Sequence, residues 1–151
     1  MRQVTVRSLN DRSYAVEADN GRGHVLVADE PTESGGEDLG PTPHELLITS
    51  LGACVAITIR MYAQRHEWPL EDISVHLTID DVAPSEPAFT PDEVASAGPS
   101  GKLPLIHSHV TVKGNLDEAQ LARLEQIAGR CPVHRALRAP PAIVTTLTHD
   151  A

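Results

Sequence analysis

Two side chains in the sequence are suited to redox or nucleophilic chemistry, the cysteines Cys54 and Cys131. They lie 77 residues apart, and their spacing fits no zinc knuckle. In a cytosolic chain, two such residues are either buried spectators or a catalytic thiol pair, and a structural disulfide is not expected. The surroundings of each thiol therefore decide between these interpretations.

Cys131 stands directly before Pro132, and proline suits the first position of a helix. We therefore predict that Cys131 is the N-cap of a short helical turn that runs to Leu137. The helix dipole and the free N–H groups at such a position stabilise a thiolate. Basic side chains flank it: Arg130, His134 and Arg135. The sequence marks Cys131 as a potentially reactive thiol, with a small buried residue at a helix junction as the alternative.

The other thiol, Cys54, lies near the middle of a long helix predicted from Pro43 to His66. Thr42 is the expected N-cap, a proline follows at the first helical position, and Glu45 is placed to complete a capping box. The helix should end near Glu67, because the proline two residues later disfavours helical geometry before it.

Apolar residues of this helix fall at almost every angle around its axis; they are Leu46, Leu47, Ile48, Leu51, Ala53, Cys54, Val55, Ala56, Ile57, Ile59 and Met61. A helix that is apolar all round must be buried all round. The chain's own elements cannot easily achieve this, so the pattern hints at a partner subunit. Polar interruptions and the short apolar core disfavour a membrane span.

The apolar surroundings of Cys54 raise a thiol pKa and make the thiol inert. To react, Cys54 needs a cation from elsewhere. Its own helix supplies none, because Arg60 is six residues on and rotated well away.

Length and composition indicate one domain, residues 1–151, with a mostly aliphatic core. The formal charge of −9 argues against nucleic acid or an anionic membrane as a partner. The scarcity of aromatic residues also removes stacking platforms for single strands. The first residues alternate like a strand instead of forming a leader, so we expect a cytoplasmic protein.

The predicted elements are arranged β-β-β-α-β-β-α-β, an α+β fold. The strands are expected at 3–9, 13–18, 24–28, 73–80, 105–113 and 143–148. The second helix should be capped by Asn115, with Glu118 at its third position, and end at Gly129. The loop 29–42 is expected to be a solvated connector, and residues 81–103 a mobile segment or a functional lid.

Three segments of the sequence resemble the OsmC/Ohr family (osmotically inducible protein C and organic hydroperoxide resistance protein). They are Gly40-Pro41-Thr42-Pro43-His44-Glu45-Leu46-Leu47, Ser50-Leu51-Gly52-Ala53-Cys54 and Cys131-Pro132-Val133-His134. The resemblance covers nearly the whole chain. It implies an intertwined homodimer whose long central helices pack together at the core, wrapped by sheets from both chains.

The resemblance also implies thiol-dependent reduction of organic hydroperoxides in oxidative-stress defence, without a metal or cofactor and with a lipoyl-type dithiol as reductant. By position, Cys54 would be the peroxidatic thiolate that becomes a sulfenic acid. Cys131 would be the resolving thiol that condenses with it to a disulfide.

The family activates the first cysteine with an arginine from the N-terminal strands, held by a glutamate at the start of the long helix. Arg12 is the best match to that arginine, with Arg7 and Arg22 as runners-up. Where the family tends to have the glutamate, this sequence has His44, and Glu45 follows one residue later.

Glu45 stands nine residues before Cys54, on the opposite side of the helix and roughly 13 Å along its axis. It would therefore act across the dimer or serve only as the capping residue. His44 could instead orient the arginine or receive a proton, or lie at the surface without a role.

Two other functions fit the sequence. An OsmC-like dimer with an apolar interface pocket could bind a small hydrophobic ligand, with both cysteines structural. A metal site could form if His76, His107 and His109 shared one sheet face, but no further ligand at short spacing completes such a site.

Overall fold

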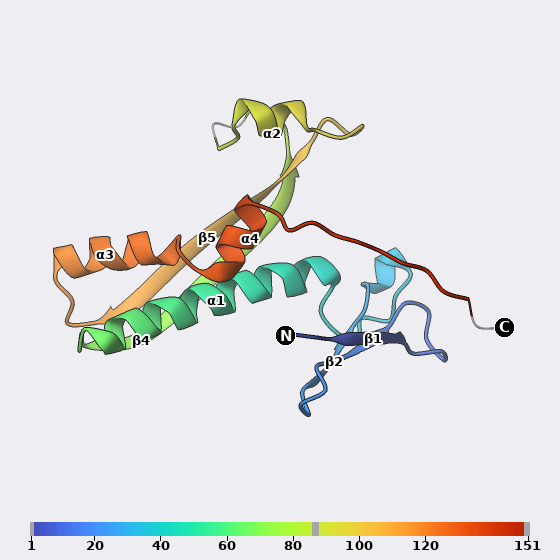
Figure 1. Ribbon diagram of the computed structural model, residues 1–151, viewed down its shortest axis with the longest axis horizontal. Coiled ribbons are helices and arrows are strands. Elements are labelled where there is room, and N and C mark those ends of the chain that lie inside the picture. Colours follow the sequence, from blue (N-terminus) through green and yellow to red (C-terminus); the bar gives the residue numbers. More distant parts are fainter. Residues whose placement is uncertain (1, 86–87, 150–151) are drawn as a thin grey trace. The chain divides into compact units, whose positions relative to one another are not determined.

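The computed structural model describes residues 2–85 and 88–149 and forms two compact units (Figure 1). The first unit comprises residues 1–49 and 79–105, and the second comprises residues 50–78 and 106–151. The long helix and the two long strands each contribute residues to both units. The architecture is α+β, as predicted.

The first unit opens with a three-stranded antiparallel sheet. Its strands are β1 (Thr5–Ser8), β2 (Val16–Asp19) and β3 (Val25–Ala28), paired in that order. This confirms the predicted meander. The second strand begins later than expected because residues 9–15 form a turn, closed by a hydrogen bond from the Leu9 N–H to the Ala15 carbonyl. A short 3₁₀ turn, η1 (Thr32–Ser34), lies in the following loop.

The long helix α1 (Pro43–Arg65) starts at the predicted residue and ends one residue before the predicted end at His66. The Thr42 hydroxyl accepts the Glu45 N–H at 3.2 Å, while the Glu45 carboxylate accepts the Thr42 N–H at 2.7 Å. At the other end the Trp68 N–H reaches the Ala63 carbonyl and Glu67 takes a φ of 54°. These contacts form a Schellman motif, in which the left-handed position is usually glycine.

Within the chain, α1 is buried along one stripe only, formed by Leu51, Val55, Ile59 and Ala63. Gly52 lies beside this stripe, where a Cβ would come 2.7 Å from Leu77 Cδ1. Other apolar side chains of the helix are exposed: Leu47, Ile57 and Met61. Among the described residues, α1 alone is long and apolar enough to cross a membrane, a property it shares with core helices of globular proteins.

The second unit is built on the long strands β4 (Leu70–Val82) and β5 (Leu103–Gly114), which form a two-stranded sheet. The helices α3 (Glu118–Ala128) and α4 (Pro132–Arg138) follow β5. The core of the second unit consists of Leu51, Val55, Ile59, Leu124, Ile127 and Cys131. The segment between the two strands carries a short helix, α2 (Pro91–Ala95), with its own capping box.

Two local predictions are wrong. The N-cap of α3 is Asp117, whose carboxylate accepts the Gln120 N–H at 2.8 Å, and not Asn115. Both positions offer a capping residue followed three later by Glu or Gln, and the turn through Gly114, with φ 141°, delays the helix by two residues.

The predicted final strand, 143–148, is absent, because no neighbouring strand in the described part of the chain pairs with this segment. Its apolar residues are almost fully exposed: Ile143 at 85%, Val144 at 89% and Leu147 at 96%. Strand propensity without a partner edge does not make a strand.

Candidate active site

The structure brings the two predicted thiols together in the second unit. Cys131 is fully buried, and Cys54, half-buried on α1, packs against the same core cluster and acts on the pKa of Cys131. Both cysteines are free thiols. The prediction that Cys131 caps α4 is confirmed, since its Sγ accepts the His134 N–H at 3.2 Å.

Burial raises the pKa of the Cys131 thiol above its ordinary value of 9.0. The His134 N–H at the start of α4 lowers it, but hydrogen bonding to Cys54 raises it further, and the net direction is upward. The expected thiolate stabilisation at the helix start is therefore outweighed by desolvation. A thiol that keeps its proton suits a resolving group better than an initial nucleophile.

His134 is fixed by its side chain as well. Its Nδ1 lies 2.7 Å from the Gly129 carbonyl, which only accepts hydrogen bonds, so Nδ1 carries the proton of that contact. His134 is therefore held twice, by its backbone N–H to Cys131 Sγ and by its ring to the Gly129 carbonyl, and these two contacts fix the turn before α4.

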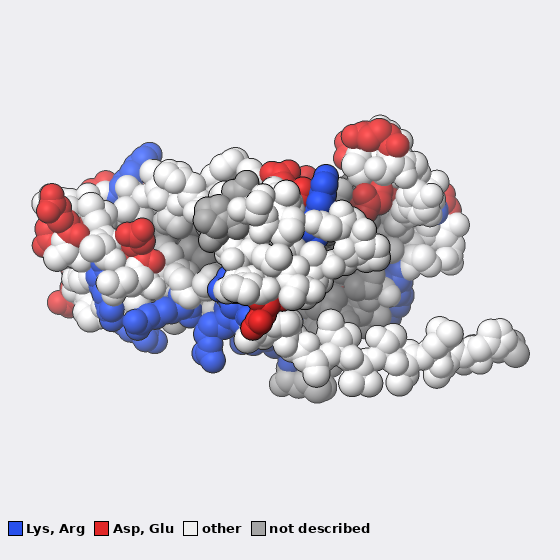
Figure 2. Space-filling view, turned by 90° about the horizontal axis from the view of Figure 1, so that it is seen from above, with Lys and Arg blue, Asp and Glu red and all other residues white. Residues whose placement is uncertain are grey.

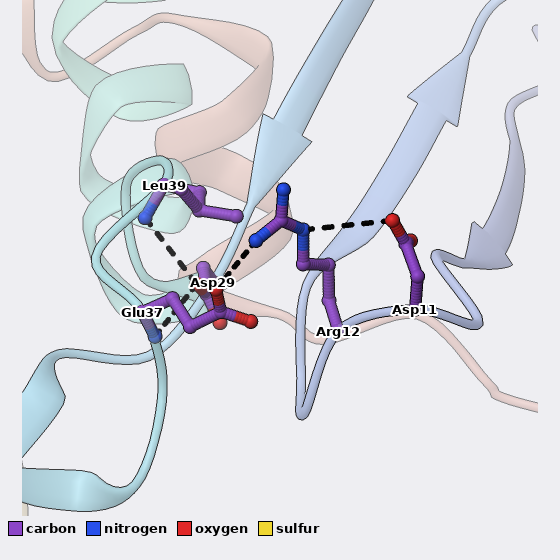
Figure 3. Close-up of polar contacts among 5 residues, drawn as sticks. All are labelled: Asp11, Arg12, Asp29, Glu37 and Leu39. Atoms are coloured by element: carbon purple, nitrogen blue, oxygen red, sulfur yellow. Dashed lines mark hydrogen bonds and ion pairs between the residues drawn. The ribbon is translucent and has the colours of Figure 1, made fainter.

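Arg12, the predicted activating cation, belongs to the first unit. Figure 3 shows its guanidinium joined to the carboxylates of Asp11 and Glu37. Its Nη1 donates to Glu37 Oε2 at 2.7 Å, and its Nε lies 3.9 Å from Asp11. The hydrogen bond and charge of Glu37 raise the pKa of the guanidinium. Of the three candidate arginines, Arg12 is in ion pairs with Glu37 and Asp11, whereas Arg7 and Arg22 make none with a described residue.

Asp29 is a buried carboxylate beneath this ion pair, only 3% exposed. Its oxygens accept N–H groups from Glu30 at 2.8 Å, Glu37 at 3.0 Å and Leu39 at 3.3 Å. Burial raises the pKa of Asp29, but these donors and the Arg12 charge lower it more, so the net pKa lies below the usual 3.8. Asp29 is therefore an anion that fixes the loop before α1.

Sequence reasoning missed Glu37 and Asp29, because loop 29–42 has no periodicity and many acids. The glycines of the loop are the sequence feature that could have indicated a packed loop. A Cβ at Gly36 would overlap the Glu30 carbonyl, and one at Gly40 would overlap the Val27 carbonyl. Glycines at which backbone approaches backbone indicate a packed loop and not a solvated connector.

Glu45 and His44 lie at the start of α1. The carboxylate of Glu45 accepts hydrogen bonds from the backbone and hydroxyl of Thr42, which is the capping arrangement. His44 is exposed.

A cavity of about 490 Å³ lies in the second unit beside the turn that holds Cys131. Its walls are largely apolar side chains of α1, β5 and α3, among them Leu51, Val55, Val110 and Leu124. Gly129 and His134 close the end nearest α4. The cavity is large enough for a small organic molecule.

Within residues 2–85 and 88–149, no three His, Cys, Asp or Glu side chains are grouped closely enough to hold a metal ion. His76, His107 and His109 are therefore not assembled as a site. The face in Figure 2 carries separate groups of acidic and basic side chains among uncharged residues.

A sequence model of the family of OsmC-like proteins matches residues 35–146, which include both cysteines and the start of α1. The chain belongs to the OsmC-like protein family. The predicted membership is thereby confirmed. No curated protein shows significant similarity to the sequence.

Solved structures share the fold of this OsmC-like chain. A protein from Psychrobacter arcticus 273-4 is 20% identical, with a TM-score of 0.69 over 90% of this chain and 88% of that one. An OsmC-like protein from Mycoplasma pneumoniae is 16% identical, with a TM-score of 0.67 over 93% and 89%. An organic hydroperoxide resistance protein OsmC from Legionella pneumophila is 24% identical, with a TM-score of 0.62 over 91% and 89%.

Proposed function

We propose that this protein is a thiol-dependent peroxidase that reduces organic hydroperoxides in oxidative-stress defence. The observation that carries the proposal is the neighbouring pair of free thiols, Cys54 on α1 and Cys131 at the cap of α4, packed in one core cluster. Family membership and the likeness to a structure named for hydroperoxide resistance support it.

The reaction uses both thiols in sequence. The Cys54 thiolate attacks the distal peroxide oxygen, so that an S–O bond forms, the O–O bond breaks and the alcohol leaves with a proton. Cys131 then attacks the resulting sulfenic acid, which forms the disulfide and releases water. An external dithiol, of the lipoyl type, reduces the disulfide and is itself oxidised.

Arg12 is the proposed cation that stabilises the Cys54 thiolate, since a nearby guanidinium favours the charged form of a thiol. Its contact with Glu37 uses Nη1, and the Asp11 carboxylate lies beyond hydrogen-bond range of Nε. N–H donors of the guanidinium thus stay available for a thiolate or a peroxide oxygen. Glu45 is proposed to contribute across a dimer, or only through the helix cap.

The proposed assembly is an intertwined, cytoplasmic homodimer. Ile57 and Met61 on α1 are 59% and 48% exposed in the single chain, although the helix is apolar on that side too. The C-terminal segment adds apolar side chains that no described residue covers. A second copy that packs against α1 would bury this surface.

Turnover with cumene hydroperoxide and dihydrolipoamide tests the proposal. The wild type should consume both, and Cys54→Ser should abolish consumption. Cys131→Ser should stop turnover after one event and leave a sulfenic acid on Cys54 that dimedone labels. Full turnover by Cys54→Ser would contradict the assignment.

The 490 Å³ cavity favours a second candidate function, the binding of a small hydrophobic ligand by an OsmC-like dimer with structural cysteines. In that case hydroperoxide would leave both thiols unmodified. An apolar ligand would still raise the melting temperature.

A further inference from the structure

The loop between β3 and α1, residues 29–42, is built more firmly than a connector requires. The Asp29 carboxylate is buried beneath it and accepts three backbone N–H groups. Gly36 and Gly40 leave no room for a Cβ, and Asp38 takes the left-handed region with φ 55°. Strain and burial of this kind persist only where the surroundings over-determine one conformation.

This packed loop fixes the position of Glu37. Its backbone N–H is held by Asp29 Oδ2, and its side chain holds Arg12 Nη1 (Figure 3). One chain of contacts therefore runs from a buried anion, through one residue, to the guanidinium. Two of these three charges are negative, and both the Glu37 and the Asp29 anions raise the pKa of Arg12.

Stability alone does not account for this arrangement. Arg12 and Glu37 are 43% and 36% exposed, and an exposed ion pair contributes little to the free energy of unfolding. Burial of a carboxylate is costly unless it is fully hydrogen-bonded. A buried carboxylate that serves an exposed ion pair is better explained as a means of fixing the guanidinium in place.

We propose that Glu37, fixed through Asp29, is the residue that positions Arg12 in the peroxidase reaction. This inference rests on the proposed function, because it gives Arg12 its task. Glu45, which stands nearest the place where the resemblance puts the positioning glutamate, has its carboxylate engaged at the cap of α1. In this chain the carboxylate that holds Arg12 lies in the loop before α1 and not on the helix.

The test compares single substitutions in the full chain. Both Arg12→Ala and Glu37→Gln should lower kcat/KM for cumene hydroperoxide about tenfold or more, and Glu37→Asp should restore part of the loss. Glu33→Gln is the matched control, because Glu33 is exposed in the same loop and makes no contact with Arg12. It should leave kcat/KM unchanged.

The pH dependence of Cys54 alkylation separates positioning from simple electrostatics. If Glu37 only adds negative charge, its removal should move the half-maximal alkylation by iodoacetamide to lower pH. If Glu37 positions Arg12, its removal frees the cation and moves the half-maximal pH upward, by about one unit. Glu33→Gln should not move it upward.

Asp29→Asn tests the other half of the chain of contacts. This substitution should lower kcat/KM, as expected for Glu37→Gln, and should speed amide hydrogen exchange at Glu37 and Leu39. Unchanged exchange would overturn the role of Asp29. Loss of turnover in Arg12→Ala with normal turnover in Glu37→Gln would overturn the role of Glu37 while the proposed function stands. A wild type without turnover would contradict the proposed function and the inference together.

Discussion

Replacement of Cys131 offers a quantitative test of its two structural contacts. The side chain is fully buried, and its Sγ accepts the His134 N–H at the start of α4. Cys131→Ala removes a buried heavy atom, which costs about 1 kcal/mol by analogy with single-methyl deletions. It also removes the N-cap acceptor, which costs about 1 kcal/mol more. We expect a loss of about 2 kcal/mol in the free energy of unfolding.

Cys131→Ser separates the loss of buried volume from the loss of the N-cap acceptor. The serine hydroxyl keeps an acceptor for the His134 N–H and a donor toward Cys54, so the cap survives while a polar group is buried. We expect a loss of about 1 kcal/mol, which places the serine variant between the wild type and the alanine variant.

Urea unfolding under reducing conditions, at one fixed protein concentration, measures the difference. With a slope of about 2 kcal/mol per molar urea, the serine and alanine variants should differ by about 0.5 M in midpoint. An alanine variant as stable as the serine variant would refute the reasoning, because Sγ would then contribute nothing as a cap.

Three further predictions follow from named contacts. Because the pKa of Cys131 is raised, the folded state keeps the thiol proton to higher pH than the unfolded chain does. The protonated thiol therefore contributes fully to the stability of the fold below pH 9.0, and this contribution is lost as the pH rises through the folded pKa. The urea midpoint should fall at alkaline pH in the wild type and fall less in Cys131→Ser. Glu67→Gly should raise the free energy of unfolding by about 1 kcal/mol, because Glu67 takes a left-handed φ of 54°, whereas Gln64→Gly inside α1 should lower it by a similar amount in the same urea titration. Ile57→Lys, on the exposed side of α1, should convert the proposed dimer to monomers, as measured by light scattering. The control Ala119→Lys, at an exposed position of α3, should leave the dimer intact. An unchanged mass of the Ile57→Lys variant would place the subunit contact elsewhere.

Several elements could be predicted from the sequence because their signals are local. The bounds of α1 follow from Thr42, Pro43 and Glu45 at its start and from Pro69 beyond its end, and the structure agrees with them. The position of Cys131 at the cap of α4 follows from Pro132 in the same way.

Other features depend on contacts distant in sequence and could not be predicted. The segment 143–148 has strand propensity, but a strand exists only where an edge pairs with it. The ion pair of Arg12 joins residues 25 apart, and the buried Asp29 resembles the other acids of its loop in sequence alone. Desolvation of Cys131 likewise depends on α1, α3 and the sheet together, so the direction of its pKa required the fold.

Cys54 and Cys131 form one redox unit in the proposed reaction. Mass spectrometry of the reduced protein after one equivalent of cumene hydroperoxide, digested without reductant, tests it directly. We predict a peptide pair joined through Cys54 and Cys131, which reverts on addition of a dithiol. Two unmodified thiols after complete exposure to the hydroperoxide would contradict the proposed peroxidase reaction.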